Sequence, residues 1–156
     1  MRCGHLPGVR DGALLGGRTV VVRGDRVEAV LAQADAGPAG AEVVDLSALT
    51  CLPGLIDAHT HVFLQPGDYD VQLLKQSLPR RTLQAVAAAR ELLEAGFTTI
   101  RDLETEGAMY AAADLRDAIE AGLVAGTRTG PPRGPSQRGA GASTMYNVVP
   151  VECGWP

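Results

Sequence analysis

Two runs of apolar side chains, separated by Gly24 and Asp25, make up most of residues 18–32. The first run is β-branched, and the second alternates polar and apolar positions, which is typical of half-buried strands. A Gly-X pair between two such runs favours a tight two-residue turn. We therefore expect a hairpin over residues 18–32, then a loop over 33–41 and a short strand over 42–46.

From residue 51 onward, strand patterns alternate with helical ones. Residues 55–62 are apolar at first and polar at their end, which predicts a strand, and residues 97–102 predict another. Residues 80–95 and 109–121 carry apolar side chains at helical spacing. The order strand, helix, strand, helix is typical of a parallel α/β unit. The expected apolar faces are Leu83, Val86, Ala89 and Leu93, then Ala111, Leu115, Ala118 and Ile119, with Gly96 and Gly122 as C-terminal caps.

The composition indicates a globular protein and excludes several classes of partner. Of 156 residues, 46% are hydrophobic and 21% charged, which excludes a chain disordered throughout. A net charge of −4 and 4% aromatic residues argue against a nucleic-acid surface. No apolar run reaches the ~18–20 residues of a membrane span, and no secretory signal is evident. We expect a cytoplasmic protein without nucleic-acid or membrane partners, and the oligomeric state stays open.

The three cysteines, Cys3, Cys51 and Cys153, are too few and too scattered to indicate a disulfide framework or a four-cysteine zinc site. We expect them to be reduced thiols, with Cys51 a small buried residue.

The last 29 residues differ from the rest of the chain. Residues 128–156 hold ten Gly or Pro, and one acid, Glu152, against three arginines. No helical or strand period is visible as far as Met145, and Trp155 has no evident role. Two interpretations remain open: a flexible linker or terminus, or translation of this stretch out of frame.

The candidate chemistry is concentrated in the motif Asp57-Ala58-His59-Thr60-His61. Alternate residues of a strand point to the same side, so Asp57, His59 and His61 share a face. Two imidazoles at this spacing can bind one divalent metal. A His-x-His pair alone is weak evidence, but polar groups that follow directly after an apolar run need a partner. Asp57 would orient a ligand or make a structural contact.

Other charged residues near this motif have structural interpretations. Asp102 ends the second predicted strand, and a salt bridge or helix cap is favoured over a role in the site. Glu104 and Glu106 are expected to be solvated loop charges rather than substrate contacts. Arg80 and Arg81 are expected at the exposed start of a helix.

The motif and its surroundings resemble the amidohydrolase superfamily. LPGLIDAHTHV at 52–62 is similar to the first barrel strand of that family, and EAGFTTIRDL at 94–103 to its second. The early segment VVVRGDRV at 20–27 resembles the N-terminal β-sandwich. TEG at 105–107 followed by LRDAIEAG at 115–122 is similar to the branch of imidazolonepropionases and Xaa-Pro dipeptidases.

The resemblance covers roughly residues 10–127. It implies an α/β protein in which part of a composite β-sandwich precedes the first two units of a TIM-like (β/α)8 barrel. We expect a sandwich portion over 1–52, a partial hydrolase barrel over 53–127 and an irregular tail over 128–156.

The resemblance also implies one or two divalent metals, of which zinc is the leading candidate, with His59 and His61 as ligands. The family's other ligands are a carboxylated lysine, two histidines and a late aspartate on later strands. Here the only other histidine is His5 and the only lysine is Lys75, and neither matches those positions. No catalytic or substrate-binding residue is assigned.

The function implied by the resemblance is hydrolysis of carbon–nitrogen bonds, in dipeptides or other amides, by a metal-activated water. Because most of the site is missing, we expect this chain to be truncated or frameshifted and inactive alone. The alternatives are a non-catalytic fragment or interaction partner, and one part of a split enzyme completed by another chain.

Overall fold

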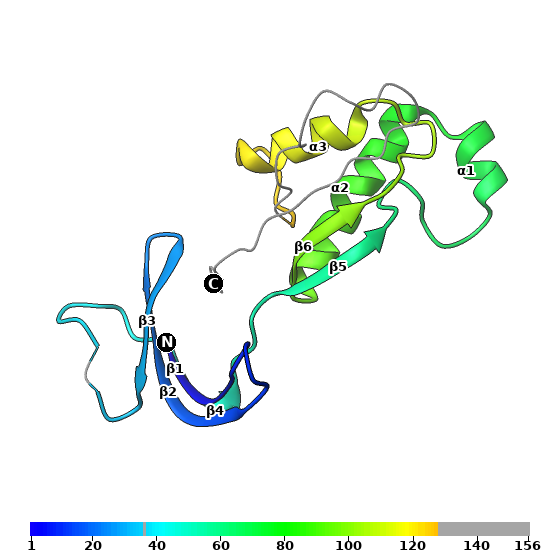
Figure 1. Cartoon of the computed structure of the whole chain (residues 1–156). Helices are drawn as coiled ribbons and strands as arrows, with labels where there is room; N and C mark the ends of the chain where they lie inside the picture. Colours follow the sequence, from blue (N-terminus) through cyan, green and yellow to red (C-terminus); the bar gives the residue numbers. More distant parts are fainter. Residues whose placement is uncertain (36, 128–156) are drawn as a thin grey trace. The chain divides into compact units, whose positions relative to one another are not determined.

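The computed structural model describes residues 1–35 and 37–127 (Figure 1). The described chain forms two compact units, Met1–Pro53 and a second one that starts at Gly54. The predictions for residues 128–156, including those for Cys153, Glu152 and Trp155, lie outside the described residues. Within the described part, no helix is long and apolar enough to cross a membrane.

The first unit is a four-stranded sheet in the order β3-β2-β1-β4. Its strands are β1 (Arg2–Pro7), β2 (Leu14–Arg23), β3 (Arg26–Ala32) and β4 (Asp45–Thr50). β2 pairs antiparallel with both β1 and β3, whereas β1 and β4 are parallel. The sheet thus brings the first residues of the chain beside residues 45–50.

The predicted hairpin is confirmed. Arg23 pairs with Arg26 around the turn, and Gly24 has a φ of +59°, a conformation that glycine adopts at little cost. The strand predicted at 42–46 lies at Asp45–Thr50 instead. β1 was not predicted, and its pairing with β4 is what decides where that strand lies.

The expectation of reduced thiols is wrong for two of the cysteines. Cys3 and Cys51 form a disulfide across 48 positions of sequence, and Cys3 is fully buried. The parallel pairing of β1 with β4 explains the contact, since Cys51 directly follows β4 and donates its N–H to the His5 carbonyl. This neighbourhood depends on the sheet register, which the scattered cysteine spacing does not reveal.

The second unit is a mixed α/β arrangement in which two parallel strands, β5 (Leu55–Thr60) and β6 (Phe97–Asp102), are connected through helices. α1 (Tyr69–Lys75) precedes the long helix α2 (Leu78–Glu94), which contacts β6, and α3 (Ala111–Glu120) follows β6 and contacts α2 (Figure 1). The two predicted strands and two predicted helices are confirmed, and α1 is additional.

The helix ends follow from local sequence. The Ser77 side chain accepts from the backbone N–H of Arg80 at the start of α2, and Pro79 occupies its first turn. Gly96, with a φ of +93°, ends α2 as expected, and Gly122, with a φ of +70°, ends α3.

The core of the second unit is built largely from small residues. Ala85 and Ala89 of α2 are fully buried, whereas Leu83, expected on the apolar face, is 71% exposed. Small side chains let the helix approach β6 and α3 closely, so the buried stripe runs through alanines. The buried core residues are Val62, Phe63, Ala85, Ala89, Ile100, Ala108, Ala111, Ala112, Leu115 and Ile119.

Candidate metal centre

The carboxyl ends of β5 and β6 lie side by side because the two strands are parallel. Thr60 pairs with Asp102, and the Leu103 N–H donates to the Thr60 carbonyl at 3.1 Å. Near the other end, a Cβ on Gly54 would overlap the Thr98 side chain, so glycine is required before the strand. This close approach lets the starts of the two strands lie side by side.

His59 and His61 point their ring nitrogens toward one another. Their Nε2 atoms are 3.4 Å apart, and the two rings lie at 60° with centroids 5.3 Å apart. Two nitrogen ligands of a tetrahedral zinc ion, each about 2.05 Å from the metal, are separated by about 3.3 Å. The spacing of the two nitrogens therefore fits two corners of such a site.

Asp57 makes a structural contact, which is one of the two roles that the sequence predicts for it. Its Oδ1 accepts a hydrogen bond of 3.0 Å from the backbone N–H of His59. The contact holds the backbone that carries the first imidazole.

Asp102 is buried at the end of β6, with 1% of its surface exposed. Among the described residues, neither carboxylate oxygen has a hydrogen-bond partner, so the expected salt bridge or helix cap is not found there. Burial raises the pKa of this carboxyl to about 7, although the charge of His61 and the nearby backbone of Val62 and Glu104 act to lower it. Asp102 thus places a buried carboxyl at the end of β6, within electrostatic reach of His61.

Glu106 is not the solvated loop charge that the sequence suggests. Its Oε1 lies 3.6 Å from Nδ1 of His61, and the two side chains are 26% and 33% exposed. Glu104, two residues earlier, is exposed as expected. Proximity of Glu106 to a histidine has no signal in the local sequence, because it depends on the path of the loop after β6.

The prediction of an exposed side chain is also wrong for Arg81. It is 5% exposed, and its guanidinium donates to three backbone carbonyls, those of Phe63, Thr105 and Glu106. Phe63 follows β5, and the other two follow β6. Arg81 therefore ties together the two loops that flank the histidines.

The remaining candidate ligands of the sequence lie elsewhere. His5 belongs to β1 in the first unit, and Lys75 is exposed at the end of α1. Within residues 1–35 and 37–127, no group of three His, Cys, Asp or Glu side chains is arranged to hold a metal ion. The described part thus offers two convergent imidazoles rather than a complete coordination sphere.

Comparison with known families decides the relationship. The family model described as "Amidohydrolase family" matches residues 50–145, which is more than half of the chain. The chain belongs to the amidohydrolase family. The predicted resemblance is thereby confirmed, and the match includes the His59 and His61 motif.

Solved structures agree with this membership. A Xaa-Pro dipeptidase with bound methionine in its active site has a TM-score of 0.73 and 26% identity, over 81% of this chain and 31% of that one. A prolidase in complex with N-methylphosphonate-L-proline has a TM-score of 0.69 and 26% identity, over 88% and 36%. Another amidohydrolase has a TM-score of 0.69 and 26% identity, over 94% of this chain and 39% of that one. The chain spans about a third of the length of these proteins, and no curated protein sequence matches it.

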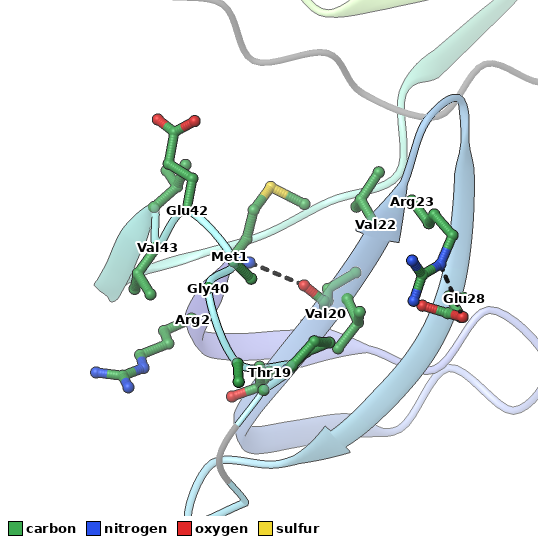
Figure 2. Close-up of a pocket in the computed structure, with 16 residues that line it drawn as sticks. Met1, Arg2, Thr19, Val20, Val22, Arg23, Glu28, Gly40, Glu42 and Val43 are labelled. Carbon is green, nitrogen blue, oxygen red and sulfur yellow. Dashed lines mark hydrogen bonds and ion pairs between the residues drawn. The ribbon is translucent and has the colours of Figure 1, made fainter.

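One cavity of this amidohydrolase chain is lined by residues of the first unit. It has a volume of about 700 Å³ in the first unit (Figure 2). At its margin the Met1 ammonium donates to the Val20 carbonyl at 2.8 Å, and Arg23 pairs with Glu28 at 3.1 Å in an exposed ion pair. Its described lining contains no histidine or cysteine. This cavity therefore offers no imidazole or thiolate ligand for a metal among its described residues.

Proposed function

We propose that the chain is a metal-binding part of a metal-dependent hydrolase that acts on carbon–nitrogen bonds. The observation that carries this proposal is the pair of Nε2 atoms of His59 and His61, 3.4 Å apart at the end of a parallel strand. Family membership supports the hydrolase class. Zinc is the metal we propose, because two convergent imidazoles suit it.

Each described residue of the site has a distinct task in this proposal. His59 and His61 hold the metal, and Asp57 fixes the backbone at His59. A bound divalent metal would acidify a water and polarise the carbonyl of the substrate. The described residues contain no assigned general base, so the remaining ligands and the base must come from elsewhere in the complete enzyme.

We propose dipeptides as the substrate class, among them those with a C-terminal proline. Two of the similar structures are described as a Xaa-Pro dipeptidase and as a prolidase bound to a phosphonate analogue of proline. We also propose that β5 and β6 are the first two strands of a (β/α)8 barrel, because active sites of that fold lie at the carboxyl ends of its strands.

The proposed domains are a sandwich portion over 1–52, a partial barrel over 53–127 and a tail over 128–156. A cytoplasmic location stays a prediction, and the Cys3–Cys51 disulfide argues against it, since disulfides are rare in reducing compartments.

The test is zinc binding by the purified chain, measured by calorimetry, together with release of proline from Xaa-Pro dipeptides. We expect His59→Ala and His61→Ala to abolish specific zinc binding. His5→Ala is the matched control, because that exposed histidine lies in the first unit, and it should bind as the unaltered chain does.

The outcomes separate the competing functions. Zinc binding without hydrolysis fits a chain that is inactive alone, whether truncated or one part of a split enzyme. Hydrolysis by the chain alone would contradict the expected inactivity. If His59→Ala and His61→Ala both bind zinc as the unaltered chain does, the metal centre is refuted. That result would favour a non-catalytic interaction partner.

A further inference from the structure

We propose that Glu106 is the positioning residue of His61 and that Arg81 holds Glu106 in place. The inference rests on the proposed function, because it assigns these residues a task toward the same metal. Neither residue is a proposed ligand, and each acts through His61.

The two ring nitrogens of His61 face different neighbours. Its Nε2 faces Nε2 of His59, whereas its Nδ1 is buried and has no hydrogen-bond partner among the described residues. The carboxylate of Glu106 lies 3.6 Å from that Nδ1, a few tenths of an ångström beyond an ordinary hydrogen bond. A small movement of either side chain closes this distance.

A carboxylate in this place selects one tautomer of the imidazole. A proton on Nδ1 points at the negative charge of Glu106 and leaves the lone pair of Nε2 directed toward His59. Histidine ligands of metals commonly donate their second N–H to a carboxylate, which fixes both the tautomer and the ring orientation. The carboxylate of Glu106, 3.6 Å from Nδ1, is placed to do this for His61.

The backbone of Glu106 adopts an unfavourable conformation at this position. Its φ is +50°, in the left-handed region that a residue with a side chain rarely adopts. Such a conformation persists where the surroundings enforce it. The Arg81 guanidinium supplies that constraint, since it donates to the carbonyls of Glu106 and Thr105 at 3.0 Å each.

Arg81 also couples the two sides of the site. The same guanidinium donates to the carbonyl of Phe63 at 3.3 and 3.4 Å, in the loop that follows His61. Its hydrogen bonds within the described residues all go to backbone carbonyls, so this buried cation holds the loops there rather than pairing with a carboxylate. One side chain thus fixes the distance between the segment that carries Glu106 and the segment that follows the imidazole.

The test is the tautomer of His61 in the metal-free full chain. The ring ¹⁵N chemical shifts of a histidine-labelled sample, recorded at pH 8 with a chelator, report which nitrogen carries the proton. We expect Nδ1–H in the unaltered chain, whereas a free neutral imidazole in water prefers Nε2–H. Glu106→Ala should return His61 toward Nε2–H, and Glu106→Gln, which keeps an acceptor oxygen, should fall between.

Arg81→Lys keeps the positive charge but cannot reach three carbonyls, so we expect a shift of the same tautomer in the same direction. Arg80→Lys is its matched control, because Arg80 is the exposed neighbour on the same helix, and Glu104→Gln controls for a lost loop charge. Far-UV circular dichroism checks the fold of each variant. If Arg81→Lys does not fold, the Glu106 series still decides the assignment.

Zinc affinity of the same samples is the second readout. We expect about a 10–100-fold loss in Glu106→Ala and in Arg81→Lys, and no loss in the two controls. An unaltered chain with Nε2–H, or a tautomer unchanged by Glu106→Ala, would overturn the proposal even if zinc binds. Failure of the unaltered chain to bind zinc, with the tautomer series as expected, would instead refute the proposed function and leave the positioning role intact.

Discussion

Replacing Asp102 by asparagine should stabilise the metal-free second unit at alkaline pH. The carboxyl is 1% exposed, and burial raises its pKa from 3.8 to about 7. Because the native state then binds the proton more tightly than the unfolded state, stability is greatest below the unfolded pKa. Stability falls as the pH rises from the unfolded pKa of 3.8 to the folded pKa of about 7, and the loss is complete above the folded pKa.

The magnitude follows from the difference between the two pKa values. A gap of about 3 pKa units corresponds to about 4 kcal/mol once both states are ionised. Between pH 5 and pH 8 the linkage gives a loss of about 2–3 kcal/mol in the free energy of unfolding. The uncharged amide introduced by Asp102→Asn removes this dependence, although it stays buried.

The assay is urea unfolding with a chelator at pH 5, 6.5 and 8, followed by circular dichroism at 222 nm. All described helices belong to the second unit, so this signal reports on the part that contains Asp102. Glu104→Gln removes a carboxylate from the same loop at an exposed position and should leave the pH dependence unchanged. Equal pH dependence in Asp102→Asn and in the unaltered chain would refute a buried, unpaired carboxyl.

Two further predictions concern stability. Ile100→Ala should lower the free energy of unfolding by about 2–5 kcal/mol, because this core side chain is only 2% exposed. Ile56→Ala is the control on the paired strand, and it should cost far less because Ile56 is 59% exposed. Equal losses of the two variants in urea unfolding would contradict the burial of Ile100. Cys3→Ser with Cys51→Ser should destabilise the first unit by about 2–4 kcal/mol, since the disulfide closes a loop of 48 positions. Thermal unfolding with and without dithiothreitol checks this, and insensitivity of the unaltered chain to the reductant would show that the bond does not form.

Local sequence predicts much of the second unit because its signals act over short distances. The strand at Phe97–Asp102 lies where the β-rich run predicts it, and Gly96 ends the preceding helix with the positive φ that glycine favours. The hairpin around Gly24 is predictable for the same reason, since the turn chemistry and the alternation of the strands both lie within a few residues.

The errors concern contacts between distant segments. Leu83 and Ala85 are two residues apart on one helix, and the neighbours of that helix decide that the alanine is buried and the leucine exposed. The disulfide between Cys3 and Cys51 likewise depends on the parallel pairing of β1 with β4. A period of 3.6 or of two residues carries no information on such pairings.

In the candidate site, too, the local sequence predicts one part and contacts between distant segments decide the rest. The motif alone is enough to place His59 and His61 on one face at the end of a strand, because the period of a strand is local, and the family match covers this motif. The approach of Glu106 to His61, the burial of Asp102 near His61 and the contact of Arg81 with the Glu106 carbonyl are visible in the folded chain and not in the motif. Parallel strands place their carboxyl ends together while the connecting chain runs through a helix, so residues far apart in sequence become neighbours through packing.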